Sequence, residues 1–228
     1  MTKAQNLPTR SLFALAKQHY EPGCSRGDHK VGFQLLKQAA ARGYIPAHEW
    51  LGAVYDYGLG TRRNPNRAFE HYKMAAAAGR PNAEYHVGIF YHEGIAVHRD
   101  YREAIKWLLR AVAHGDDTAA YWLGQCYLHG RGVPRDEEEG FRLIHRAAEK
   151  RVVPAQYSLG VCYEHGQGVT ADSEAAFRWY LRAARRGYPA AAISLAHCYE
   201  NGLGTTRNKQ RAEFWSRYRG VASVARND

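Results

Sequence analysis

The sequence predicts an all-α solenoid of about six helix pairs. The first observation is a small residue that recurs every 36 positions, at Gly52, Gly88, Gly124, Gly160 and then Ala196. A tyrosine and a second glycine keep the same spacing, at Tyr55, Tyr91, Tyr127, Tyr163 and Tyr199 and at Gly58, Gly94, Gly130, Gly166 and Gly202. A fixed period of this length is typical of stacked repeats, because each repeat buries its apolar face only against its neighbours.

The first helix of the repeat is predicted from residues 44–79, which serve as the reference unit. Pro46 stands near its start, and Gly58 and Gly60 end it. Between them, one apolar stripe has residues three or four positions apart, at Ala47, Leu51, Val54 and Tyr55. Gly52 lies beside that stripe. Glycine within a helix costs roughly 1 kcal/mol relative to alanine, so we expect a neighbouring helix to approach closely there.

The second helix of each repeat is predicted from a polar residue that can cap its start. A side-chain oxygen at this position accepts a hydrogen bond from the exposed amides of the first turn. The column holds Asn64, Asp100, Asp136, Asp172 and Asn208. The helix is expected to stop at a glycine in three units, at Gly79, Gly115 and Gly187, whereas Arg151 takes that place in the fourth.

The terminal units match the pattern less well, which is typical of capping repeats. We predict a tail at 1–7 and one solenoid domain at 8–220, followed by a frayed tail at 221–228. The predicted repeats are 8–43 (the degenerate N-terminal cap), 44–79, 80–115, 116–151, 152–187 and 188–220 (the C-terminal cap).

Composition limits the class of protein and its compartment. The 228 residues carry a net charge of +10, with basic ends and a balanced middle, and contain no apolar stretch long enough to span a membrane. Cys126, Cys162 and Cys198 share one apolar column without a partner in the same repeat, which favours a reducing compartment. We therefore predict a cytoplasmic protein, or a periplasmic one if a signal peptide has been removed.

The repeat reads A-x₃-L-G-x₂-Y-x₂-G-x-G, followed by a loop and A-x₂-W/Y-x-x-A-A-x₃-G, and it resembles the Sel1-like repeat, a relative of the tetratricopeptide repeat. Three single positions depart from this pattern: Val87, Ala96 and Gly140 replace a leucine, a glycine and an alanine. The resemblance implies a right-handed superhelical solenoid of antiparallel helix pairs that acts as a protein-binding adaptor or scaffold.

Two other functions are open to a protein of this pattern. One is an inhibitor or immunity-type protein that sequesters a single partner through the same surface. The other is an enzyme directed at β-lactams, as implied by some secreted relatives. Those relatives carry paired cysteines in each repeat, and this chain does not, so the enzymatic alternative is disfavoured.

The candidate binding surface is the concave face formed by the first helices. A helical wheel places one column opposite the apolar stripe, and this column is a ladder of Tyr85, Tyr121 and Tyr157. Tyrosine suits a binding groove because it offers area and a polar tip at low entropy cost. The alternative is that neighbouring first helices bury these rings against each other. The same face is expected to hold Ile89, Gln125, Trp50, Trp122, His129 and His165.

A second candidate surface is a basic edge along the loops that follow the paired glycines. It comprises Arg62, Arg63, Arg99, Arg135 and Arg207, and it suits an acidic protein surface. Nucleic acid is not expected as a ligand, because the arginines and the tyrosines lie on different faces. His129 and His165 could be close enough for a metal or a proton relay. They lack a third ligand or a nucleophile, so we predict no catalytic residue, metal or cofactor.

One aromatic column of the second helices is expected to be core. It contains Trp107, Trp179 and Trp215, together with His71 and Leu143 in the other repeats.

Overall fold

The computed structural model describes residues 7–218, and in that part of the chain it has twelve α-helices and no strand. The helices alternate as first and second members of six pairs. They are α1 (Thr9–Gln18), α2 (Arg26–Ala41), α3 (Ile45–Tyr57), α4 (Pro65–Ala77), α5 (Pro81–Glu93), α6 (Tyr101–Ala113), α7 (Asp117–His129), α8 (Glu137–Glu149), α9 (Val153–His165), α10 (Ser173–Arg185), α11 (Pro189–Asn201) and α12 (Lys209–Ser216). The expected tail at 221–228 lies outside the described residues.

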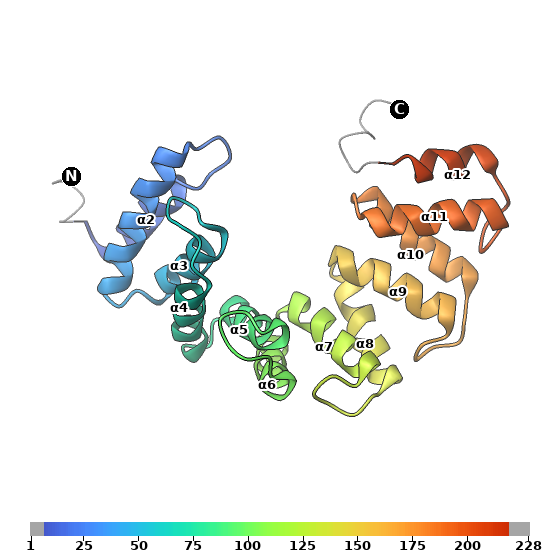
Figure 1. The fold of residues 1–228 in the computed structure, drawn as a ribbon, viewed down its shortest axis with the longest axis horizontal. Helices are drawn as coiled ribbons and strands as arrows, with labels where there is room; N and C mark the ends of the chain where they lie inside the picture. The colour runs from blue at the N-terminus through green and yellow to red at the C-terminus, as the bar shows by residue number, and fades with distance from the viewer. Residues whose placement is uncertain (1–6, 219–228) are drawn as a thin grey trace. The chain divides into compact units, whose positions relative to one another are not determined.

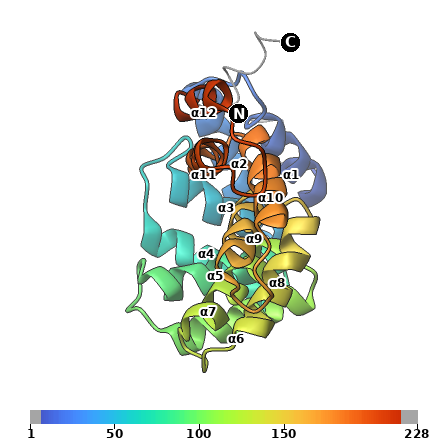
Figure 2. The same cartoon turned by 90° about the vertical axis from the view of Figure 1, so that its right-hand side faces the viewer.

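The chain divides into two compact units, residues 1–116 and residues 117–228. Unit 1 holds α1–α6 and unit 2 holds α7–α12. Within each unit every helix packs against the helices that precede and follow it in the chain (Figure 1). Figure 2 shows the same pairs from the side, with the longer loops joining the first helix of a pair to the second. Alanine, leucine and tyrosine side chains form most of the buried core.

The five predicted N-caps are confirmed. In α10, the Asp172 carboxylate accepts a hydrogen bond from the Ala175 amide at 3.0 Å. Asn64, Asp100, Asp136 and Asn208 cap α4, α6, α8 and α12 in the same way. Since this bond satisfies an amide that the helix itself leaves unpaired, the capping residue fixes where each second helix begins.

The close helix approach expected at the glycine column is also confirmed. A Cβ placed on Gly52 would lie 2.5 Å from the ring of Tyr72, and one on Gly160 would lie 2.6 Å from the ring of Tyr180. Both tyrosines belong to the second helix of the same repeat and are buried. The second helix therefore packs into the space that a side chain at this glycine would occupy.

Two residues other than glycine adopt left-handed backbone conformations in the described chain, and each stands in a glycine column. Ala96 has φ 62° where the loops of other repeats have Gly60, Gly168 and Gly204. Arg151 has φ 68° where other second helices are followed by Gly79, Gly115 and Gly187. A side chain in this region costs roughly 1–2 kcal/mol. The repeat imposes the conformation even where the sequence lacks the glycine.

Replacing Ala96 by glycine is expected to stabilise the protein by about 1 kcal/mol, because it removes this strain and keeps the loop geometry. Urea unfolding of the two proteins measures the difference. Ala171→Gly is the control: Ala171 lies in another repeat loop, three residues after Gly168, the equivalent of Ala96, and has no positive φ. There the added freedom of the unfolded chain should lower stability. Equal effects of the two substitutions would contradict the strain at Ala96.

The repeating cysteines are core residues. Cys126, Cys162 and Cys198 are buried and unpaired, and burial raises the pKa of the Cys126 and Cys198 thiols to about 11. Thiols with such a pKa stay protonated at neutral pH and are poor nucleophiles. Their column therefore serves packing, as the periodicity predicts.

The tryptophan column differs from its expected burial. Leu143 is buried, but Trp107, Trp179 and Trp215 are only half-buried. The guanidinium of Arg110 lies 4.6 Å from the Trp107 ring, and that of Arg182 lies 4.4 Å from the Trp179 ring. These indoles lie at the border of the core, where one face packs and the other carries a cation.

Candidate partner-binding surface

In unit 2, the tyrosine ladder combines packing with exposure. Tyr121 on α7 and Tyr157 on α9 are both half-buried. Burial raises the pKa of the Tyr121 hydroxyl, and the Tyr157 ring centroid lies 5.1 Å from that of Tyr188 and 5.6 Å from that of Tyr180. Each ring therefore uses part of its surface to join helices and leaves part of it accessible.

The same column ends in an exposed aliphatic side chain. Ile193 on α11 is 71% exposed, the largest fraction among the exposed large hydrophobic residues of the described chain. Gln125 on α7 and Ile89 on α5 are half-buried. An exposed isoleucine that continues a tyrosine column makes the first-helix side of unit 2 a surface with apolar and polar contacts side by side.

In unit 1, the expected surface residues are more involved in packing. Tyr85 on α5 lies beside His86, with ring centroids 4.9 Å apart. Trp50 on α3 is covered by α1 and the turn after it, with its ring centroid 6.1 Å from that of Phe13 and 5.9 Å from that of Tyr20. In this part of the chain, Trp50 joins two repeats and is not an open groove floor.

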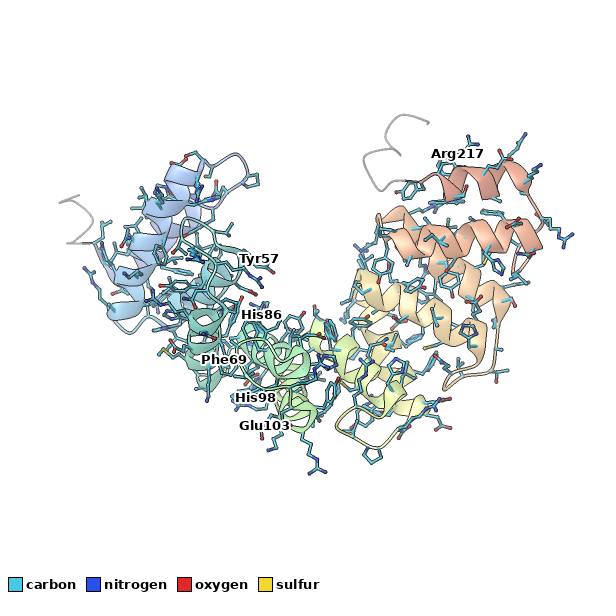
Figure 3. All side chains as sticks on the ribbon, in the orientation of Figure 1. Tyr57, Phe69, His86, His98, Glu103 and Arg217 are labelled. Carbon is cyan, nitrogen blue, oxygen red and sulfur yellow. The ribbon has the colours of Figure 1, made fainter. Side chains whose placement is uncertain are left out.

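The most exposed aromatic residue of unit 1 is at the end of a first helix. Tyr57 is the last residue of α3 and is 67% exposed (Figure 3).

On the first helix of unit 2, Trp122 is half-buried and its ring lies 5.7 Å from that of Tyr121.

The two histidines of the candidate surface are exposed at the ends of their helices. His165 lies 3.9 Å from the neighbouring Glu164 carboxylate. Burial, together with Arg131 and Arg135, holds the pKa of His129 below its usual value. Among residues 7–218, no three His, Cys, Asp or Glu side chains gather as metal ligands.

Part of the predicted basic edge is paired within its own loops. Arg63 donates to the Asp56 carbonyl at 2.8 Å and lies 3.5 Å from the Asp56 carboxylate. Arg99 donates to the Glu93 carbonyl at 3.4 Å, and Arg135 pairs with Glu137. Arg62 and Arg207 are exposed. Much of this charge therefore stabilises loops, and less of it is available to a partner.

Unit 1 contains a buried polar cluster that the sequence analysis does not predict. The Glu84 carboxylate on α5 is fully buried, 2.9 Å from the Arg110 guanidinium and 2.7 Å from the His114 imidazole, both of which come from α6 and its end. Arg110 also donates to the Ala76 carbonyl at 3.3 Å. A buried carboxylate that contacts both a guanidinium and an imidazole makes a local polar network. The 36-residue column held a signal, because Glu84 is its one acidic residue and the neighbouring repeats have His48, Ala120, Gln156 and Ala192 there.

None of the helices within residues 7–218 combines the length and the apolar composition that a membrane span requires.

Comparisons with known proteins agree with this architecture. A model of the Sel1 repeat matches the chain six times, at residues 9–44, 45–79, 81–116, 118–151, 153–188 and 189–217. No curated protein is significantly similar to the chain.

Several solved structures are similar to the chain in fold. The chain is similar to a Sel1 repeat protein from Oxalobacter formigenes, with 26% identity and a TM-score of 0.79 over 90% of this chain and 80% of that one. It is also similar to a protective antigen of uropathogenic Escherichia coli strains, with 30% identity and a TM-score of 0.81. That match covers 93% of this chain and 46% of the antigen, so the chain spans less than half of its length.

A more distant similarity extends to an immunity protein from Pseudomonas aeruginosa, with 19% identity and a TM-score of 0.62 over 95% of this chain and 84% of that one. At this identity the similarity concerns the fold alone. The six matched repeats cover nearly all of the described helices, and the protein therefore belongs to the Sel1 repeat family.

Proposed function

We propose that this protein is a non-catalytic scaffold that binds a partner protein along the surface of its first helices. The observation that carries the proposal is Ile193, which is 71% exposed at the end of the column that contains Tyr121 and Tyr157. An exposed aliphatic residue in the same repeat column as half-buried tyrosines has the composition of the centre of a protein interface, where aromatic and apolar groups are enriched.

Family membership supports the same reading. Sel1 repeat proteins are in general protein-interaction scaffolds, and their fold is typically not enzymatic. The buried cysteines and the loop-bound arginines have structural roles in this chain, which leaves the first-helix surface as the best place for a partner. Tyr121, Tyr157 and Ile193 form its proposed centre in unit 2.

We expect Ile193→Glu to abolish capture of the partner while the protein stays folded, because Ile193 has little packing to lose and the new charge must be desolvated in the interface. Immobilised wild-type and variant chains are incubated with a lysate, and the retained proteins are compared by mass spectrometry. Circular dichroism and thermal unfolding check the fold.

The matched control is Leu109→Glu, since Leu109 is 46% exposed on the second helix α6. A partner retained by the wild type and by Leu109→Glu, but lost by Ile193→Glu, supports the proposal. Equal retention by all three proteins, or loss in both variants, would move the interface away from the first helices.

A further inference from the structure

Unit 2 contains a pocket at the position where unit 1 holds its buried carboxylate. Two repeats separate the two positions, so Glu84 corresponds to Gln156, Arg110 to Arg182 and His114 to Arg186. The pocket has a volume of about 420 Å³ and is lined by Ala148, Glu149, Arg151, Gln156, Arg182, Arg185 and Arg186. We call it the arginine pocket.

The arginine pocket keeps the arginine of the unit 1 cluster and has Arg186 in place of His114, but it has lost the buried carboxylate. Gln156 is 4% exposed, and its amide donates to the Ala148 carbonyl at 3.3 Å. In unit 1 the equivalent carbonyl, that of Ala76, accepts from Arg110 instead. The neutral glutamine therefore takes the backbone acceptor and supplies no charge to the guanidinium groups around it.

The guanidinium groups of the arginine pocket have no carboxylate partner in the described part of the chain. Arg182 stacks on Trp179, and Arg186 donates to the Arg151 carbonyl at 3.2 Å, but neither of them, nor Arg185, takes part in an ion pair within 4.0 Å. The one acidic residue that lines the pocket, Glu149, lies 3.9 Å from His145 instead.

Arg151 adds a fourth guanidinium to the arginine pocket at a cost to the backbone. Its φ of 68° is a conformation that the other repeats give to glycine. Side chains held in such conformations are concentrated at functional sites, where the strain is offset by what the side chain does. The strain and the missing anion are independent observations, and both concern the same pocket.

We propose that the arginine pocket binds a glutamate or aspartate carboxylate from an acidic segment of the partner protein, an inference that rests on the proposed scaffold function. In unit 1 the arginine equivalent to Arg182 already contacts a carboxylate, since Arg110 lies 2.9 Å from Glu84. Stacking on Trp179 holds the Arg182 guanidinium in place before binding, and guanidinium groups suit planar carboxylates by forming paired hydrogen bonds.

The test uses the full chain and a fluorescein-labelled octapeptide in which glutamate alternates with serine, followed by fluorescence anisotropy. An otherwise identical peptide with glutamine in place of glutamate measures binding that does not depend on carboxylates. We expect the glutamate peptide alone to bind, with an affinity that falls as salt is raised. Binding of both peptides alike, or of neither, would overturn the proposal.

Three variants locate the binding. Arg182→Ala/Arg186→Ala removes two cations, and Gln156→Glu rebuilds the internal carboxylate of unit 1; each should weaken peptide binding by roughly tenfold or more. The matched control is Arg178→Ala, an exposed arginine of α10 that pairs with Glu174 outside the pocket. An equal loss in Arg178→Ala would show general charge attraction and contradict a site.

Arg151→Gly is expected to change stability and peptide affinity in opposite directions, which a purely structural role of Arg151 would not produce. The substitution should raise the thermal midpoint, because it removes backbone strain, and should weaken peptide binding at the same time. Higher stability with unchanged affinity would exclude Arg151 from the site. Stronger binding of an oligothymidylate of equal charge than of the glutamate peptide would overturn the choice of a carboxylate.

A partner that is lost by Ile193→Glu but retained by Arg182→Ala/Arg186→Ala would overturn the arginine pocket and leave the first-helix surface as the interface.

Discussion

Acidification from pH 7 to pH 4 is expected to lower the free energy of unfolding through two half-buried histidines of unit 1. Burial lowers the pKa of both His71 and His86 to about 4. His48 and Arg67 lower the pKa of His71 further, whereas Asp56 and Glu49 act against burial at His86. Both imidazoles are therefore neutral in the folded protein at neutral pH.

The folded and unfolded chains protonate these histidines at different pH values, and this difference determines how stability changes with pH. An unfolded chain protonates these histidines near pH 6.5, while the folded chain does so only near pH 4. Between those values the unfolded state binds more protons, so stability is full above about pH 6.5 and falls as the pH decreases. Allowing for their partial exposure, we expect a loss on the order of 3 kcal/mol for the pair.

The environment of these histidines explains why they resist protonation. The His71 Nδ1 atom lies 3.0 Å from that of His48, so one nitrogen must donate and the other accept. The His86 ring stacks on the buried Tyr72, with centroids 4.3 Å apart. If both Nδ1 atoms carried a proton, neither could accept the hydrogen bond between His71 and His48. A charge at His86 would be poorly solvated against the Tyr72 ring.

The measurement is urea unfolding of the wild type and of His71→Leu/His86→Phe at pH 7 and pH 4.5. Leucine is the residue that the repeat itself uses at position 143 of the same column, and phenylalanine preserves the stacking on Tyr72. The variant should lose less stability than the wild type between the two pH values. Parallel losses in the two proteins would assign the acid sensitivity to other groups.

Gly160→Ala is expected to destabilise the protein by about 2 kcal/mol, although alanine is the better helix former. The added methyl group would lie 2.6 Å from the Tyr180 ring. Tyr180 is buried, and its ring centroid lies 5.6 Å from that of Tyr157, so the ring is packed on another side as well. Overpacking should therefore exceed the gain of roughly 1 kcal/mol that helix propensity alone would give.

Ala196→Gly is the matched control, because Ala196 occupies the same column in the last repeat. It should also destabilise the protein, by about 1 kcal/mol, through lost helix propensity. The urea denaturation midpoints of the wild type and the two variants measure these changes in stability. If Gly160→Ala raised the midpoint, helix propensity and not the approach of Tyr180 would govern this column.

Much of the architecture is readable from the sequence because it depends on nearby residues. The side chain of Asp172 bonds the amide of Ala175, three positions away, so its effect on α10 needs no information from elsewhere. Gly166 likewise ends α9 through its own φ of 69°. Repetition of such local signals every 36 residues then implies stacked helix pairs.

The tyrosine ladder shows the limit of that reasoning. A helical wheel places Tyr157 opposite the apolar stripe, but the ring lies against Tyr180 on α10 and Tyr188, the residue that precedes α11. Trp50 is likewise covered by residues of α1. A wheel describes one helix, whereas the burial of a ring depends on the helices that surround it.

The sequence by itself determined the repeat, the helix boundaries and the apolar columns, because caps, left-handed turns and periodic stripes act within a few residues. Only the tertiary structure decided which charges are neutralised. Glu84 takes its partners from 26 and 30 positions further along the chain, and the Gln156 amide bonds the preceding second helix. The balance of charge in a pocket is set by side chains from several helices, and their distances exist only once those helices have packed.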